Sequence, residues 1–186
     1  MPRIELNNGV LMLSAGFGTH LLDAGSCERA VSEALLAGSR LVEAATTTCE
    51  EGMGRAVACC GTSRDELFVT CGLPEGSAGR DDALRRFDES LERTGLDYLD
   101  LFLADAPHPG TWGAWRALEE LYQEGVVRAL GVRGTSADEL EGLLDECAVP
   151  PAVALAGPEG AVTGLPGEVA LLVREARGAL RVLGAR

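Results

Sequence analysis

The chain alternates short apolar runs with longer segments in which apolar residues recur at helical spacing. Near the start, Asn7-Asn8-Gly9 predicts the turn of a β-hairpin between Arg3–Leu6 and Val10–Ser14. Seven strands are expected after it, at Gly16–His20, Leu41–Ala45, Glu66–Cys71, Tyr98–Leu103, Val127–Val132, Val153–Ala156 and Leu180–Leu183. Helices are expected at Cys27–Ala37, Glu51–Cys60, Arg80–Thr94, Thr111–Glu124, Ser136–Cys147 and Gly167–Ala176.

The predicted strands are continuous apolar runs, which is typical of a parallel sheet covered on both faces. A doubly wound sheet and a (β/α) barrel both satisfy this pattern, but no GxGxxG follows the first of the seven strands. We therefore expect one domain over residues 1–186: an α/β chain forming a TIM-type barrel that is truncated after about the seventh strand and preceded by a β-hairpin.

The amino-acid composition limits the reactions and partners that the chain could have. The 16 basic residues are all Arg, so Schiff-base and lysine-base mechanisms are excluded. With 29 acidic residues the formal charge is −13, which argues against nucleic acid and anionic membrane surfaces as partners. The sequence shows neither a signal peptide nor an apolar run long enough to span a bilayer. The six Cys are scattered, without metal-ligand spacing, and indicate buried thiols of a cytoplasmic protein.

Several strings, in order along essentially the whole chain, carry a family resemblance. They include Leu6–Val10, Gly16–Thr19, Ala30–Leu35, Gly54–Ala56, Arg64–Thr70, Ser90–Leu101, Ala114–Leu121 and Gly125–Val132. Together they resemble the aldo-keto reductase family, most strongly at Ser90–Leu101. The resemblance implies a (β/α)8 barrel that uses NADPH and a catalytic Asp, Tyr, Lys and His at the ends of barrel strands.

The residues at those four positions differ from the family's. The Asp position holds Glu43, and the Tyr position falls at or beside Thr48. The Lys position holds Gly72, and the His position holds Asp105. The family's nicotinamide-binding pairs correspond to Arg133-Gly134 and Ala154-Leu155. We therefore expect that no cofactor is bound, because both the NADPH contacts and the proton donor differ.

The carboxyl ends of barrel strands share one pocket, so the same mapping predicts a site. Glu43 and Asp105 are expected there as acid and base, with His20 as a proton shuttle. Substrate binding is expected from Arg133, Thr48, Trp112 and His108. Structural interpretations stay open: Glu43 and Arg133 could form an ion pair that fills the cofactor site, and His108 could be a surface loop residue.

These residues favour a cofactor-independent isomerase, dehydratase or cyclase acting on a small oxygenated metabolite. Secondary metabolism of a high-GC bacterium is compatible with the Arg-, Ala- and Gly-rich composition. One alternative is a non-catalytic binding or regulatory protein on a disabled reductase scaffold, and another is a residual NADPH-dependent oxidoreductase. A barrel that lacks its eighth strand would leave unpaired edges. We therefore expect a homodimer that covers the gap, with Leu180–Arg186 near the interface.

Overall fold

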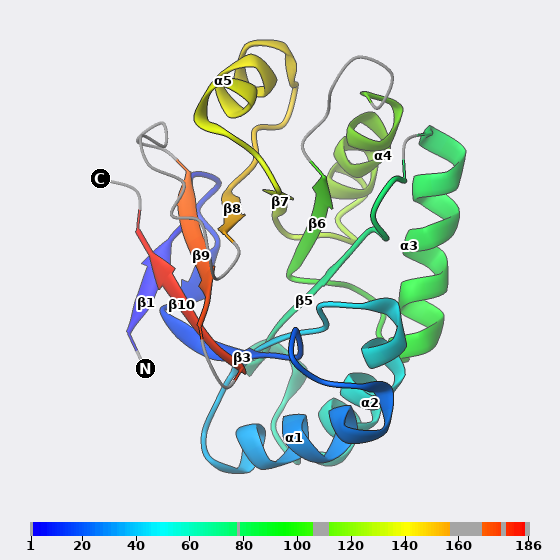
Figure 1. Cartoon of the computed structure of the whole chain (residues 1–186), viewed down its shortest axis with the longest axis vertical. Helices are drawn as coiled ribbons and strands as arrows, with labels where there is room; N and C mark the ends of the chain where they lie inside the picture. Colours follow the sequence, from blue (N-terminus) through cyan, green and yellow to red (C-terminus); the bar gives the residue numbers. More distant parts are fainter. Residues whose placement is uncertain (1, 78, 106–111, 157–168, 176–177, 185–186) are drawn as a thin grey trace.

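Most of the chain forms a closed barrel with helices along part of its outside (Figure 1). A computed structural model describes residues 2–77, 79–105, 112–156, 169–175 and 178–184. The strands are β1 Arg3–Glu5, β2 Leu11–Leu13, β3 Ala15–Gly18, β4 Leu41–Glu43, β5 Phe68–Gly72, β6 Leu101–Asp105, β7 Leu130–Arg133, β8 Val153–Ala156, β9 Ala170–Arg174 and β10 Ala179–Leu183. The helices are α1 Ala24–Leu36, α2 Thr47–Cys59, α3 Arg80–Thr94, α4 Trp112–Gln123 and α5 Ala137–Glu146, with a 3-10 turn at Arg64–Glu66.

The N-terminal hairpin forms as predicted, with Gly9 in the left-handed conformation at its turn (φ 81°). The side-chain amides of Asn7 and Asn8 donate to the carbonyl oxygens of Pro151 and Arg128. Both acceptors come shortly before a barrel strand begins, so the hairpin covers the amino-terminal end of the barrel.

The barrel contains eight strands, in the order β10-β3-β4-β5-β6-β7-β8-β9. Neighbours from β3 through β9 are parallel, whereas β10 pairs antiparallel with both β9 and β3. The predicted TIM-type barrel is therefore confirmed, and the expected gap after the seventh strand is wrong. Because β9 and β10 complete the ring, β3 has no free edge that a second copy must cover.

The predicted helix at Gly167–Ala176 is wrong over the residues that the structure describes there. Ala170–Arg174 is strand β9, which pairs with β8 on one side and β10 on the other. A short apolar run such as Ala170–Val173 fits a buried helix and a buried strand equally well. Tertiary pairing decides between them, since a strand here closes the barrel.

Two apolar clusters hold the fold together. One lies between strands and helices and includes Val31, Met53, Phe87 and Trp115. The other fills the barrel interior with residues such as Leu41, Leu103, Leu155 and Leu172, and it includes Met12 of the hairpin. Further along the strands, toward their carboxyl ends, the inward-facing side chains are polar. A functional site is therefore expected at that end of the barrel. Among the described residues, no helix combines the length and apolarity needed to cross a membrane.

Candidate functional site

Four charged side chains from four strands meet at the carboxyl-terminal mouth of the barrel. Glu43 ends β4, Asp105 ends β6, Arg133 ends β7 and Arg174 ends β9. Two residues before each of them, on the same face of the strand, lies an apolar residue of the interior cluster or a glycine. The alternation of a strand therefore directs all four toward the barrel axis.

Glu43 and Arg174 form a buried ion pair across the mouth. The Arg174 Nη2 group donates to Glu43 Oε1 at 2.6 Å, and Nε lies 3.2 Å from both carboxylate oxygens. The Glu43 side chain is 1 % exposed and that of Arg174 is 18 % exposed. A Cβ at Gly18 would lie 2.7 Å from Glu43 Oε2, so this position accommodates the carboxylate only without a side chain. The pair ties β9 to β4 across the two intervening strands.

Arg133 and Asp105 form a second pair at a more open position. Arg133 Nε donates to Asp105 Oδ1 at 2.8 Å, and Arg133 Nη2 donates to the carbonyl oxygen of Leu73. The backbone N–H of Gly76 donates to the other oxygen of Asp105 at 3.1 Å. A Cβ at Gly72 would lie 2.9 Å from Arg133 Nη1, so the guanidinium occupies space that a larger residue at Gly72 would fill.

The predicted acid and base are thus kept apart. Glu43 is buried against Arg174, whereas the Asp105 side chain is 42 % exposed against Arg133. The expectation that Glu43 and Asp105 share one low-dielectric environment is wrong, because each has its own guanidinium partner. The considered pair of Glu43 with Arg133 is wrong for the same reason.

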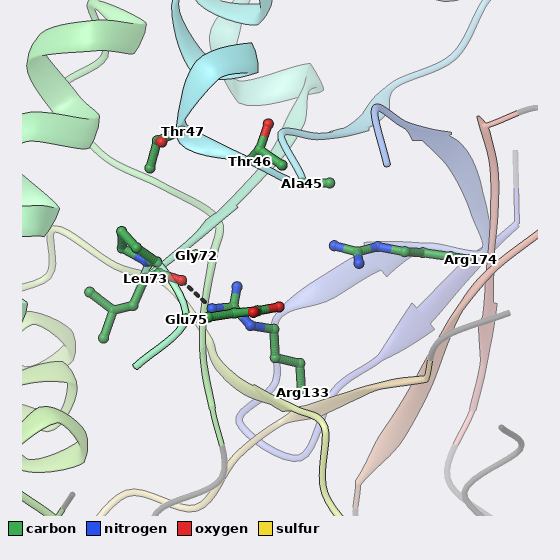
Figure 2. A pocket seen from close by; sticks show the side chains of 9 residues that line it. Ala45, Thr46, Thr47, Gly72, Leu73, Glu75, Arg133 and Arg174 are labelled. Carbon is green, nitrogen blue, oxygen red and sulfur yellow. Dashed lines mark hydrogen bonds between the residues drawn. The ribbon is translucent and has the colours of Figure 1, made fainter. Parts of the chain in front are cut away.

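A cavity of about 380 Å³ opens beside these pairs (Figure 2). Arg174 enters it from one side and Arg133 from another. Its described lining is Ala45, Thr46, Thr47, Gly72, Leu73, Pro74, Glu75, Arg133 and Arg174. The size is within the range of small-molecule sites, and the lining is rich in hydrogen-bond donors.

His20 and Thr70 contribute unused hydrogen-bonding capacity behind this cavity. His20 Nε2 lies 3.1 Å from the carbonyl oxygen of Glu175, and a Cβ at Gly18 would lie 3.3 Å from His20 Nδ1. Thr70 pairs in register with Glu43 on the neighbouring strand. Neither His20 Nδ1 nor Thr70 Oγ1 has a hydrogen-bond partner among the described residues, and both atoms are buried.

Three predicted substrate contacts do not line the cavity or cannot be placed. Thr48 is exposed in the first turn of α2, where its hydroxyl meets that of Thr46 at 2.9 Å. Trp112 begins α4 and packs against the helix-side core, with the Arg116 guanidinium 5.7 Å above its ring. Neither Thr48 nor Trp112 is in the described lining of this cavity, and their roles in substrate binding stay predictions. His108 lies outside the described residues.

Arg174 and the neighbouring pair Thr46 and Thr47 are the functional candidates that sequence reasoning missed. Arg174 was assigned to a helix, so its place at a strand end was not expected. The available signal was the alternation of Ala170, Leu172 and Arg174, which fits the inward face of a strand that ends in a polar residue.

The buried thiols take no part in this site. Burial raises the pKa of Cys27 to about 12 and raises that of Cys71 well above its ordinary value, so both stay protonated near neutral pH. Among the described residues, no three His, Cys, Asp or Glu side chains are placed to hold a metal ion.

Comparison with known proteins identifies the relatives of this barrel. The model of the aldo/keto reductase family matches residues 15–157. The chain is 39% identical over 157 residues to morphine 6-dehydrogenase of Pseudomonas putida, covering 82% of this chain and 53% of that protein. It is 37% identical over 153 residues to glyoxal reductase of Bacillus subtilis, covering 81% and 55%. The chain thus spans about half the length of the curated relatives it matches.

Solved structures agree with this result. An aldo-keto reductase from a deep-sea metagenome library of the Medee basin superposes with a TM-score of 0.84 at 30% identity, covering 91% of this chain and 66% of that chain. A Bombyx mori aldo-keto reductase in complex with NADP gives 0.82 at 26% identity, covering 92% and 65%.

These relatives correct two expectations. Proteins named as a dehydrogenase and as reductases contradict the expected cofactor-independent isomerase, dehydratase or cyclase. The relative solved with NADP contradicts the expectation that no cofactor is used. The matched family model and the identities above 30% show that the chain belongs to the aldo-keto reductase family.

Proposed function

We propose that this chain serves an NADPH-dependent oxidoreductase that interconverts a small carbonyl compound and its alcohol at the barrel mouth. The observation that carries the proposal is the identity of 36–39% to proteins named as reductases or dehydrogenases. The cavity at the strand carboxyl ends supports it, because that end of a β/α barrel is where such enzymes place their chemistry.

The described lining suits the nicotinamide end of the nucleotide. Thr46 and Thr47 offer hydroxyl groups to the carboxamide of the nicotinamide, and Arg133 and Arg174 offer guanidinium donors to the substrate oxygen. Ala154 and Leu155 of β8 offer only backbone groups, so the two threonine side chains would hold the nicotinamide on the described part of the chain. When bound, NADPH supplies a hydride to the carbonyl carbon, and the oxygen then requires a proton.

On the described part of the chain, the proton would come from a group other than tyrosine. Tyr98 packs against Arg64 with its ring centroid 4.0 Å from the guanidinium carbon, and Tyr122 lies on α4. Neither lines the cavity. Glu75 is exposed and is the titratable acid of the described lining, so we assign the exchange of a proton with the carbonyl oxygen to Glu75.

The remaining predicted residues receive positioning roles. Glu43 holds the Arg174 guanidinium, and Asp105 holds that of Arg133. His20 lies against Gly18 behind Glu43 and anchors the end of β9 through its contact with the Glu175 carbonyl oxygen. They act on the substrate through the two arginines.

Nucleotide oxidation tests the function. With glyoxal as the carbonyl compound, we expect loss of NADPH absorbance matched one to one by alcohol product. Glu75→Gln should lower kcat more than it raises KM, and the exposed-surface variant Arg80→Met should match the parent. Calorimetry that detects no NADPH binding, together with no NADPH oxidation, would contradict the proposal.

A homodimer, a cytoplasmic location and one domain over residues 1–186 stay predictions. The six free cysteines support a reducing compartment. The closed barrel removes the open edge on which the expected dimer was argued. Light scattering at high concentration tests the dimer directly.

A further inference from the structure

Each arginine at the mouth is anchored by one edge of its guanidinium and leaves the other edge unused. Arg174 donates from Nε and Nη2 to Glu43, and Arg133 donates from Nε to Asp105 and from Nη2 to the Leu73 carbonyl. Within the described part of the chain, Nη1 of neither arginine has a hydrogen-bond partner. Two oriented amino groups are therefore available at one site.

Both amino groups belong to the same cavity (Figure 2). The side chains of Arg133 and Arg174 are 16 % and 18 % exposed, so they are mostly withdrawn from water. A guanidinium donor that is held in place and has no acceptor among the described residues is available to an oxygen atom in the cavity. Their anchored edges fix the direction in which the free donors point.

The charge around the cavity decides what kind of oxygen fits. Both guanidinium charges are already matched by carboxylates, at 2.6 Å in Glu43 and 2.8 Å in Asp105. Glu75 adds a third carboxylate to the lining. Among the described residues, two cations thus face three anions, so this part of the site offers strong donors without a net positive charge. A carboxylate ligand would be repelled where an uncharged oxygen would not.

We propose that Arg133 and Arg174 are the paired donors that bind an uncharged carbonyl oxygen, and that this site selects neutral hydroxycarbonyl or dicarbonyl compounds over oxo acids. The identification of that carbonyl as the reacting group rests on the proposed function. During reduction the oxygen gains negative charge before it takes up a proton, and fixed guanidinium donors stabilise that charge more than they stabilise the ground state.

Direct binding without nucleotide tests the selectivity. Dihydroxyacetone and hydroxypyruvate share a three-carbon skeleton and differ by an uncharged hydroxymethyl group against a carboxylate. By calorimetry we expect dihydroxyacetone to bind at least about tenfold more tightly. Equal affinity, or tighter binding of hydroxypyruvate, overturns the proposal. Because no NADPH is present, this result is independent of whether the chain oxidises NADPH.

Variants that remove either guanidinium group test whether it binds the ligand. Arg133→Met, and separately Glu43→Gln combined with Arg174→Met, should each weaken dihydroxyacetone binding about tenfold or more. The double variant removes both buried charges together, which preserves the fold. Arg80→Met is the matched control, since Arg80 pairs with Glu120 on the helical surface.

A variant that removes one carboxylate charge separates the loss of a hydrogen-bond donor from a change in the electrostatic field of the site. Asp105→Asn should narrow the preference for dihydroxyacetone several-fold, because it removes a negative charge that repels the carboxylate of hydroxypyruvate. Unchanged dihydroxyacetone affinity in an Arg133→Met protein that melts like the parent would overturn the role of the pair.

Discussion

At the scale of single residues, Glu43 depends on Arg174 as its counter-ion. Arg174→Met would leave a carboxylate that is 1 % exposed without a partner, so we expect a loss of about 3–5 kcal/mol in the free energy of unfolding. Combining it with Glu43→Gln should restore most of that loss. Urea unfolding measures both variants, with Arg80→Met as a control of unchanged stability. Equal stability of Arg174→Met and the parent would show that the pair is not maintained in solution.

The buried thiol of Cys27 gives a second prediction at this scale. Burial first, and then its contact with Cys49, raises the pKa of Cys27 from 9.0 to about 12. Below pH 9 the thiol is protonated in both states, so stability does not depend on it. Between pH 9 and pH 12 only the unfolded chain loses the proton, and stability falls by about 1.4 kcal/mol per pH unit.

Cys27→Ala should therefore make the alkaline loss of stability less steep, as measured by urea unfolding at several pH values. Cys59→Ser, at an exposed cysteine, serves as the control. An unchanged slope in Cys27→Ala would show that its thiol ionises equally in both states.

The sequence predicts single residues of the site unevenly. Glu43, Asp105 and Arg133 follow from the resemblance to the family, together with the rule that the carboxyl ends of barrel strands share one pocket. Their partners do not follow, because Arg174 lies 131 residues from Glu43 along the chain and its own element was predicted as a helix. Spacing along the chain carries no information on which of several carboxylates a guanidinium reaches.

At the scale of elements, amphipathic helices were predicted most accurately. Arg80–Thr94 forms as predicted, since its apolar stripe is regular and Gly95 ends it in the left-handed conformation. Helix α5 begins as predicted with the reciprocal bonds between Ser136 and Glu139. By contrast, Ala170–Arg174 has no local signal that separates a helix from a strand, and only its pairing with β8 and β10 determines the outcome.

The approach of β10 to β3 depends on Gly178. Its φ is +77°, and a Cβ there would lie 2.7 Å from the Phe17 ring and 2.8 Å from the Gly18 carbonyl oxygen. Gly178→Ala should therefore cost about 1–3 kcal/mol beyond the strain of the positive φ alone. Gly61→Ala is the matched control, because Gly61 has φ +70° and open space around it.

Urea unfolding compares the two glycine variants, and hydrogen exchange should show the β10 amides opening first in Gly178→Ala. If both substitutions cost the same, backbone strain alone explains the effect and the close approach to β3 contributes nothing.

At the scale of the whole molecule, closure of the barrel is the property on which stability depends. Ending the chain after residue 168 would remove β9 and β10, and with them both neighbours that bridge β8 to β3. We expect such a variant to associate, because it exposes two strand edges and the apolar interior around Leu172 and Leu180. Light scattering should show large, heterogeneous particles. A shortened chain with the parent's size and melting temperature would mean that the ring closes without the last two strands.

The reversed direction of β10 has a consequence for the rim of the site. Each parallel strand leaves the mouth through a connection that must travel back along the outside of the ring. Between β9, which ends at Arg174, and antiparallel β10, which begins at Ala179, the chain instead reverses direction and needs no such return connection. The wall of the entrance can therefore change in length between these two strands while the described helices stay in place, and variation in ligand size would be accommodated there at low structural cost.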